Sequence, residues 1–137
     1  MLKTAAVLQF LLAAGHLLCL LCLDAVFRIY GIDVLMDRFA AVGAALPYVM
    51  TLGIACGLAG CGVYALSAAG VVRPLPLLRP MIYAIGCVFL LRALSGLAAM
   101  GMRGECPATE ISAVLVSALI GALYLAGGIR TFKTLHA

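Results

Sequence analysis

Four long apolar stretches alternate with shorter segments that carry most of the charged residues. The stretches cover about residues 4–23, 44–72, 81–102 and 111–129. Each is long enough for a helix to cross the hydrocarbon core of a bilayer, which takes about 20 residues. The alternating ten-residue segments of a membrane β-barrel are absent. The pattern predicts an all-α membrane protein, a bundle of four transmembrane helices that forms a single domain over residues 1–137.

The composition also points to a lipid environment. Of the 137 residues, 66% are apolar and 10% are charged, against about 25% charged in an average soluble domain. So few charges cannot cover a water-soluble fold of this size, which excludes a cytosolic enzyme, a nucleic-acid-binding module and a disordered tail. The expected partner is the lipid bilayer and not a nucleic acid.

The basic residues near the ends of the stretches predict the orientation. Five lie on one side, namely Lys3, Arg73, Arg79, Arg130 and Lys133, and three on the other, namely Arg28, Arg38 and Arg103. Because basic residues concentrate in short cytoplasmic segments, both termini are expected in the cytoplasm. The first stretch follows a lysine as a signal peptide does, but it is too long and lacks a small-residue cleavage site. We therefore expect a retained helix.

The segment of residues 24–46, between the first two stretches, is too long for a simple turn. Asp33 is suited to cap a helix in which Leu35, Met36 and Phe39 share an apolar face. Such a short helix would lie at the headgroup level or extend the second spanning helix. The alternative is a plain connector, and the sequence does not decide between them.

A block of motifs covers about residues 51–97. Gly-Val-Tyr-Ala-Leu-Ser at residues 62–67 is followed by Leu-Pro-Leu-Leu-Arg at 75–79 and Leu-Leu-Arg at 90–92. This block resembles a group of small bacterial four-span inner-membrane proteins without an assigned activity, itself loosely similar to DoxX-like proteins. Some DoxX-like proteins accompany quinone-linked sulfur enzymes. The resemblance implies a multi-pass protein of the bacterial inner membrane, and it carries no catalytic residue onto this chain.

Arg92 is the one charged residue that the topology does not explain. It lies about eleven residues from either end of the third stretch, or about 16 Å deep at 1.5 Å per residue. A charge at that depth usually faces the bundle interior and marks a pathway or a ligand. His16 is expected at the same depth, and Ser95 and Ser117 complete a polar mid-membrane patch. This patch is the predicted ligand-binding site; the alternative is that Arg92 binds helix carbonyls and serines and only locks the bundle.

No Asp or Glu falls within the four predicted spans. A proton-coupled exchanger of the small multidrug type would therefore lack its essential carboxylate. An arginine within a span but without an acidic partner supports the predicted polar site. Arg92 together with small-residue helix faces also allows a dimeric carrier for a small anion.

Cys19 and Cys22 form a Cys-x-x-Cys motif at the outer end of the first stretch, and Cys106 lies in the second outer loop. These cysteines suggest a quinone-linked thiol–disulfide oxidoreductase. Against this, a reactive thiol favours a helix N-terminus, whereas the pair is predicted at a C-terminal end, and a second outer cysteine pair is missing. His16 and Cys19 lie one turn apart and would suit Cu(I), but we expect no metal site in so methionine- and cysteine-rich a chain.

Small residues four apart, such as Gly53 and Gly57, allow helices to approach closely. Such faces predict tight contacts within the bundle, in a homodimer or with a membrane-protein partner. The leading functional prediction is an accessory or small-ligand-binding membrane protein. It is expected to have no cofactor, and a role without enzymatic activity is favoured over an enzymatic one. The thiol oxidoreductase, for which quinone is the cofactor, and the anion carrier are the alternatives.

Overall fold

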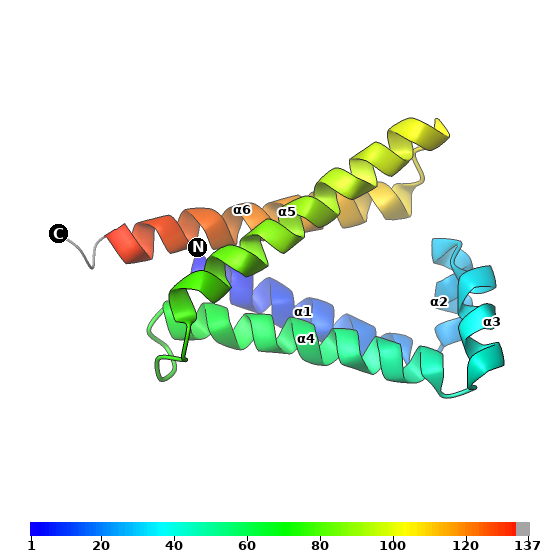
Figure 1. The fold of residues 1–137 in the computed structure, drawn as a ribbon, viewed down its shortest axis with the longest axis horizontal. Coiled ribbons are helices and arrows are strands. Elements are labelled where there is room, and N and C mark those ends of the chain that lie inside the picture. Colours follow the sequence, from blue (N-terminus) through cyan, green and yellow to red (C-terminus); the bar gives the residue numbers. More distant parts are fainter. Residues whose placement is uncertain (134–137) are drawn as a thin grey trace. The chain divides into compact units, whose positions relative to one another are not determined.

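The computed structural model describes residues 1–133, apart from the side chains of Asp24, Tyr30 and Asp33. This part of the chain forms six helices and no strand (Figure 1). They are α1 (Leu2–Cys19), α2 (Leu23–Tyr30), α3 (Asp33–Val42), α4 (Leu46–Ala68), α5 (Leu78–Arg103) and α6 (Ala108–Lys133). Of these, α1, α4, α5 and α6 are long and apolar enough to cross a membrane. The predicted fold class is confirmed: the chain is an all-α, multi-pass membrane protein with four spanning helices.

The helix boundaries differ from the sequence prediction by up to four residues. Two of these differences, at the end of the first span and at the start of the fourth, affect the candidate site residues. Helix α1 ends at Cys19, because the next three amides turn back onto the carbonyls of residues 17–19 at 3.1–3.2 Å. A helix that the sequence did not predict, α2, then begins at Leu23. Of the two alternatives for the segment between the first two spans, a short helix is present as α3, and Ile32 rather than Asp33 occupies its N-cap position. Helix α6 begins at Ala108, ahead of the predicted start at Ile111.

The chain divides into two compact units. One comprises Met1–Leu8 and Cys61–Ala137, and we call it the hairpin unit. The other comprises Gln9–Gly60, and we call it the cavity unit.

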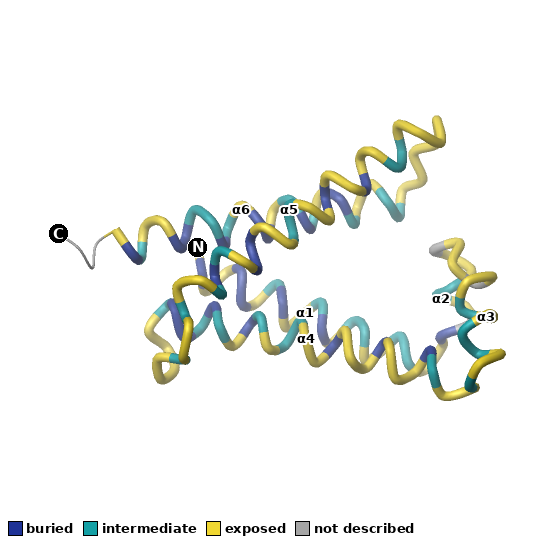
Figure 2. The backbone as a smooth tube through the Cα atoms, in the orientation of Figure 1, coloured by how far each residue is buried: buried dark blue, intermediate teal, exposed yellow. Residues whose placement is uncertain are grey.

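Helices α5 and α6 pack along each other and run antiparallel in the hairpin unit (Figure 1). Gly104 ends α5 in the left-handed conformation with φ 68°, and its amide donates to the Met100 carbonyl at 3.0 Å. Buried positions recur along both helices (Figure 2). A Cβ added at Gly121 would lie 2.8 Å from Leu90 Cγ and 3.0 Å from the backbone oxygen of Gly86. Glycine at these contacts therefore lets the two backbones approach more closely than any larger residue would.

Two buried polar residues hold the end of α4 and the loop that follows it. The Tyr124 hydroxyl of α6 donates to the Cys61 carbonyl of α4 at 2.7 Å. The Ser67 hydroxyl donates to the Arg73 carbonyl at 2.9 Å, and the Leu75 amide donates to Ser67 Oγ at 3.0 Å. A single serine thus satisfies both a donor and an acceptor of the proline-containing loop.

The cavity unit has a looser construction. Helices α2 and α3 pack side by side, joined through Gly31 in the left-handed conformation with φ 66°. A Cβ added at Gly53 or Gly57 of α4 would meet no atom within 4 Å. The close helix contacts that the sequence predicted for this glycine pair therefore do not occur within the cavity unit, and the glycines that do make such contacts lie in the hairpin.

Candidate functional site

The four residues predicted to form one polar patch belong to different units. Arg92, Ser95 and Ser117 lie in the hairpin unit, and His16 lies in the cavity unit. The Ser95 hydroxyl donates to the Arg92 carbonyl at 2.9 Å, one helical turn earlier, while Ser117 is buried on α6. His16 lies in the last turn of α1, because that helix ends at Cys19. The predicted patch therefore comprises residues of two different units.

Arg92 has an acidic partner in the fourth spanning helix. Its Nη2 atom lies 3.5 Å from Oε2 of Glu110. The sequence prediction that no spanning helix contains an acidic residue is wrong, because α6 starts early enough to place Glu110 in its first turn. A carboxylate is stabilised there by the positive end of the helix dipole. The signal was present in the sequence: Pro107 followed within three residues by a glutamate is typical of a helix start.

Gly96 provides the space for this ion pair. A Cβ at Gly96 would lie 3.0 Å from Arg92 Nη1 and 3.8 Å from Glu110 Oε2, as well as 2.5 Å from Val114 Cγ2. The guanidinium therefore extends over Gly96, one turn along α5 toward the start of α6. The side chains of Arg92 and Glu110 remain 47% and 33% exposed. This arrangement compensates the charge of Arg92 and ties α5 to α6. Arg92 is therefore not a cation without an acidic partner, which was the observation that motivated the predicted polar patch.

A cavity of about 230 Å³ lies in the cavity unit, among residues of α1, α2, α3 and α4. We call it the His16 cavity. Its lining residues are His16, Cys19, Leu23, Val26, Phe27, Ile32, Met36, Met50, Thr51 and Ile54. Most of these side chains are apolar, and the polar ones are few. A concave, largely apolar cavity with a small number of polar groups is the usual form of a small-molecule site.

Two polar side chains of the His16 cavity are held by backbone carbonyls of their own helices. Nδ1 of His16 lies 2.8 Å from the carbonyl oxygen of Leu12. The Thr51 hydroxyl donates to the carbonyl oxygen of Pro47 at 2.9 Å, and Thr51 is 8% exposed. These bonds fix the orientation of both side chains. Sequence analysis singled out His16 but not Thr51, although a lone threonine near the start of an apolar helix was a visible signal.

A second cavity of about 140 Å³ shares Leu23, Phe27 and Met36 with the His16 cavity. It is also lined by Asp37 and Tyr48. Polar side chains from α3 and from the start of α4 therefore lie next to the largely apolar His16 cavity.

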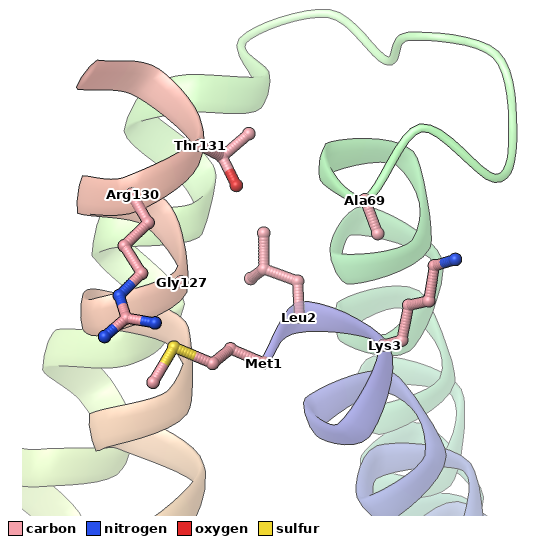
Figure 3. Close-up of a pocket in the computed structure, with 7 residues that line it drawn as sticks. All are labelled: Met1, Leu2, Lys3, Ala69, Gly127, Arg130 and Thr131. Atoms are coloured by element: carbon pink, nitrogen blue, oxygen red, sulfur yellow. The ribbon is translucent and has the colours of Figure 1, made fainter. Parts of the chain in front are cut away.

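A larger cavity, of about 320 Å³, lies in the hairpin unit where α1 begins and α6 ends. Its charged side chains are Lys3 and Arg130 (Figure 3). They extend away from each other, and Leu2 stands between them (Figure 3). Because the two cations do not converge on a common point, this cavity does not form a chelating anion site.

Gln9 was not singled out in the sequence. It is fully buried in α1, and neither its Nε2 nor its Oε1 atom has a hydrogen-bond partner in the described part of the chain. An unpaired buried amide costs about 1–3 kcal/mol per group. Gln9 is therefore an energetic cost within a spanning helix rather than a contributor to its stability.

All six cysteines are free thiols. Cys19 is the last residue of α1 and lines the His16 cavity, whereas Cys106 is exposed in the hairpin unit. Cys22 occupies the N-cap position of α2, so its expected place at a helix C-terminus is corrected. Among the side chains that the structure describes, no three His, Cys, Asp or Glu residues gather into a group that could hold a metal ion.

No protein-family model, no curated protein and no solved structure matches this chain.

Proposed function

We propose that this chain is a small-ligand-binding or accessory protein that takes up a small, largely apolar molecule in the His16 cavity. The observation that carries the proposal is the cavity itself, an apolar space with His16 and Thr51 held in fixed orientations. An apolar cavity of about 150 Å³ is enough to hold benzene. A volume of about 230 Å³ is therefore suited to a single substituted ring.

The proposed location is the bacterial inner membrane, with both termini in the cytoplasm. The bias of basic residues supports this orientation, because Lys3, Arg73, Arg79, Arg130 and Lys133 adjoin the cytoplasmic ends of the four spanning helices in it. The resemblance of residues 51–97 to small bacterial inner-membrane proteins supports a bacterial inner membrane as the location. The proposed partners are the bilayer and a second copy or another membrane protein, contacting the open face at Gly53 and Gly57.

Photolabelling tests the binding proposal. The full chain in lipid nanodiscs is irradiated with 3-trifluoromethyl-3-phenyldiazirine, an apolar carbene precursor, and the modified residues are mapped by mass spectrometry. We expect saturable labelling of cavity-lining residues such as Phe27 and Ile54, suppressed by excess 4-ethylphenol. The lipid-exposed Leu94 of α5, 60% exposed, serves as the control. Labelling of Phe27 and Ile54 that is no stronger than at Leu94, and that does not saturate, would contradict the proposal.

A second candidate is a quinone-linked thiol–disulfide oxidoreductase, favoured by Cys19 in the cavity wall and Cys22 at the N-cap of α2. The positive end of a helix dipole stabilises a thiolate. Two thiols would form a disulfide and pass two electrons and two protons to a quinone, which becomes a quinol. This candidate predicts a Cys19–Cys22 or Cys22–Cys106 disulfide in isolated membranes. Complete alkylation of all three thiols without a reductant would refute it.

A further inference from the structure

We infer that the His16 cavity selects its ligand by a neutral hydrogen-bond donor, the hydroxyl of a phenol or quinol, and discriminates against carbonyl groups. The inference rests on the proposed function and names the class of molecule that the same cavity takes. It follows from the hydrogen bonds that His16 and Thr51 already donate to backbone carbonyls, which leave both side chains as acceptors.

The hydrogen bond of His16 determines its tautomer. The Leu12 carbonyl oxygen, 2.8 Å from Nδ1, has lone pairs and no hydrogen to give. Nδ1 must therefore carry the proton and donate it. A neutral imidazole has a single ring N–H, so Nε2 is left as an acceptor. The remaining hydrogen-bonding atom of His16 requires a donor from its ligand.

Thr51 is also left as a hydrogen-bond acceptor, because its hydroxyl hydrogen is already donated. Its hydroxyl has one hydrogen, and that hydrogen is directed at the Pro47 carbonyl oxygen 2.9 Å away. Oγ1 retains unused lone pairs. Because this bond lies within one turn of α4, a ligand that required the Thr51 hydrogen would have to break it. Thr51 thus also presents an acceptor.

The rest of the wall offers little to compete with these two atoms. The lining side chains from α2 are hydrocarbon, and the sulfur atoms of Cys19, Met36 and Met50 form only weak hydrogen bonds. A carbonyl oxygen placed at Nε2 would set lone pair against lone pair and leave both atoms without a partner. A charged donor such as an ammonium group would lose its hydration in apolar surroundings at a high cost. A neutral hydroxyl on a ring satisfies the acceptors and fills the volume.

Matched ligands test the inference. In the photolabelling assay, 4-ethylphenol competes against its methyl ether, 4-ethylanisole, and against a methyl-substituted 1,4-benzoquinone. Each concentration is corrected for measured partition into the nanodiscs. We expect the phenol to compete at about one-tenth the concentration of the ether, the effect of one hydrogen bond. His16→Phe, which keeps a ring and removes the acceptor, should bring this ratio close to one, and Thr51→Val should reduce it.

Two controls separate a loss of recognition from a loss of folding. Ser95→Ala, in the hairpin unit, should retain the full preference for the phenol. In the unsubstituted protein, the phenol should shift the ¹⁵N signal of His16 Nε2 in histidine-labelled samples, with His136, the only other histidine, as the internal reference.

The outcomes distinguish the inference from the function on which it rests. Equal competition by phenol and ether, or stronger competition by the quinone, would overturn the donor preference while the cavity still binds a ligand. Failure of every compound to compete would contradict the proposed function and the inference with it. A phenol preference that persists in His16→Phe would also overturn the inference, because the acceptor would then lie elsewhere.

Discussion

The hairpin unit and the cavity unit place polar residues in apolar helices for different purposes. In the hairpin, Arg92 lies beside Glu110 over a glycine, and the neighbouring backbones approach at Gly86 and Gly121. In the cavity unit, Nδ1 of His16 bonds to a carbonyl of its own helix, and His16 lines a cavity of about 230 Å³. One unit uses its polar group to close a helix contact. The other places the imidazole of His16 in the wall of a cavity.

The comparison teaches that the depth of a charge along a sequence is a weaker guide to function than the availability of its polar atoms. Arg92 drew attention because a charge within a spanning helix is costly. That cost is offset by a partner supplied from α6. A neutral histidine costs less to bury than a charged arginine. The hydrogen bond from His16 Nδ1 to the Leu12 carbonyl oxygen leaves the lone pair of Nε2 as an acceptor for a ligand. Three predictions sharpen this contrast.

The largest effect on stability is expected from adding a side chain at the close helix contact of Gly121. In Gly121→Ala the new methyl group would meet Leu90 Cγ at 2.8 Å and the backbone oxygen of Gly86 at 3.0 Å, and the backbone cannot rotate away. We expect a loss of about 1–3 kcal/mol in the free energy of unfolding, the usual cost of overpacking. Reversible unfolding in mixed micelles, followed by circular dichroism, measures it.

Gly57→Ala is the matched control, because its Cβ would meet nothing within 4 Å. It should be neutral or gain up to about 1 kcal/mol from the higher helix propensity of alanine. A loss at Gly57 as large as that at Gly121 would contradict the contrast between the units. Were that loss accompanied by a dimer-to-monomer change, it would locate the proposed second copy on this face.

An intermediate effect is expected at the ion pair. Glu110→Gln leaves Arg92 charged without a partner and should cost about 1–2 kcal/mol, between the values for exposed and buried pairs, because both side chains are partly exposed. Arg92→Leu should cost less, because Glu110 in the first turn of α6 remains stabilised by the helix dipole. The double variant should recover most of the Glu110→Gln loss. Additive losses in this double-mutant cycle would show that the pair does not couple.

The smallest effect on stability is expected at His16, together with the largest effect on binding. In His16→Phe the Leu12 carbonyl loses only a side-chain donor, so the free energy of unfolding should change by less than about 1 kcal/mol. The double variant at Arg92 and Glu110 should show the reverse, with ligand competition unchanged. If the ion-pair variant abolished labelling of the cavity and His16→Phe did not, the assignment of roles would be reversed.

Much of the fold could be predicted from apolar pattern alone. The four spanning helices follow from the length of the apolar stretches, whereas the sequence left open whether the segment after Ile32 is a helix or a plain connector. Helix α2 was missed, because an apolar run that continues to Leu23 does not reveal that the amides of residues 20–22 turn back onto residues 17–19. Among the site residues, His16 was identified and Thr51 was not.

The motif block at residues 62–79 illustrates how the structure changes the meaning of a pattern. Ser67 bonds two backbone groups of the loop at Arg73 and Leu75, and Arg79 lies 5.7 Å from the ring centroid of Phe132. These contacts give the motif a structural explanation: its polar residues hold a turn and a helix contact in place. The residue that points to a ligand, His16, lies outside the block.

By itself, the sequence determined that this is a membrane protein and how many spanning helices it has. Four apolar stretches of about 20 residues or more, in a chain with so few charges, can be accommodated only in a lipid bilayer. Only the tertiary structure decided what each polar residue does there. The start of α6 brings Glu110 to Arg92, and the turn after Cys19 leads the chain into the helices that close the cavity around His16. Partners of this kind come from different helices, so their meeting depends on packing and helix boundaries that no local pattern encodes.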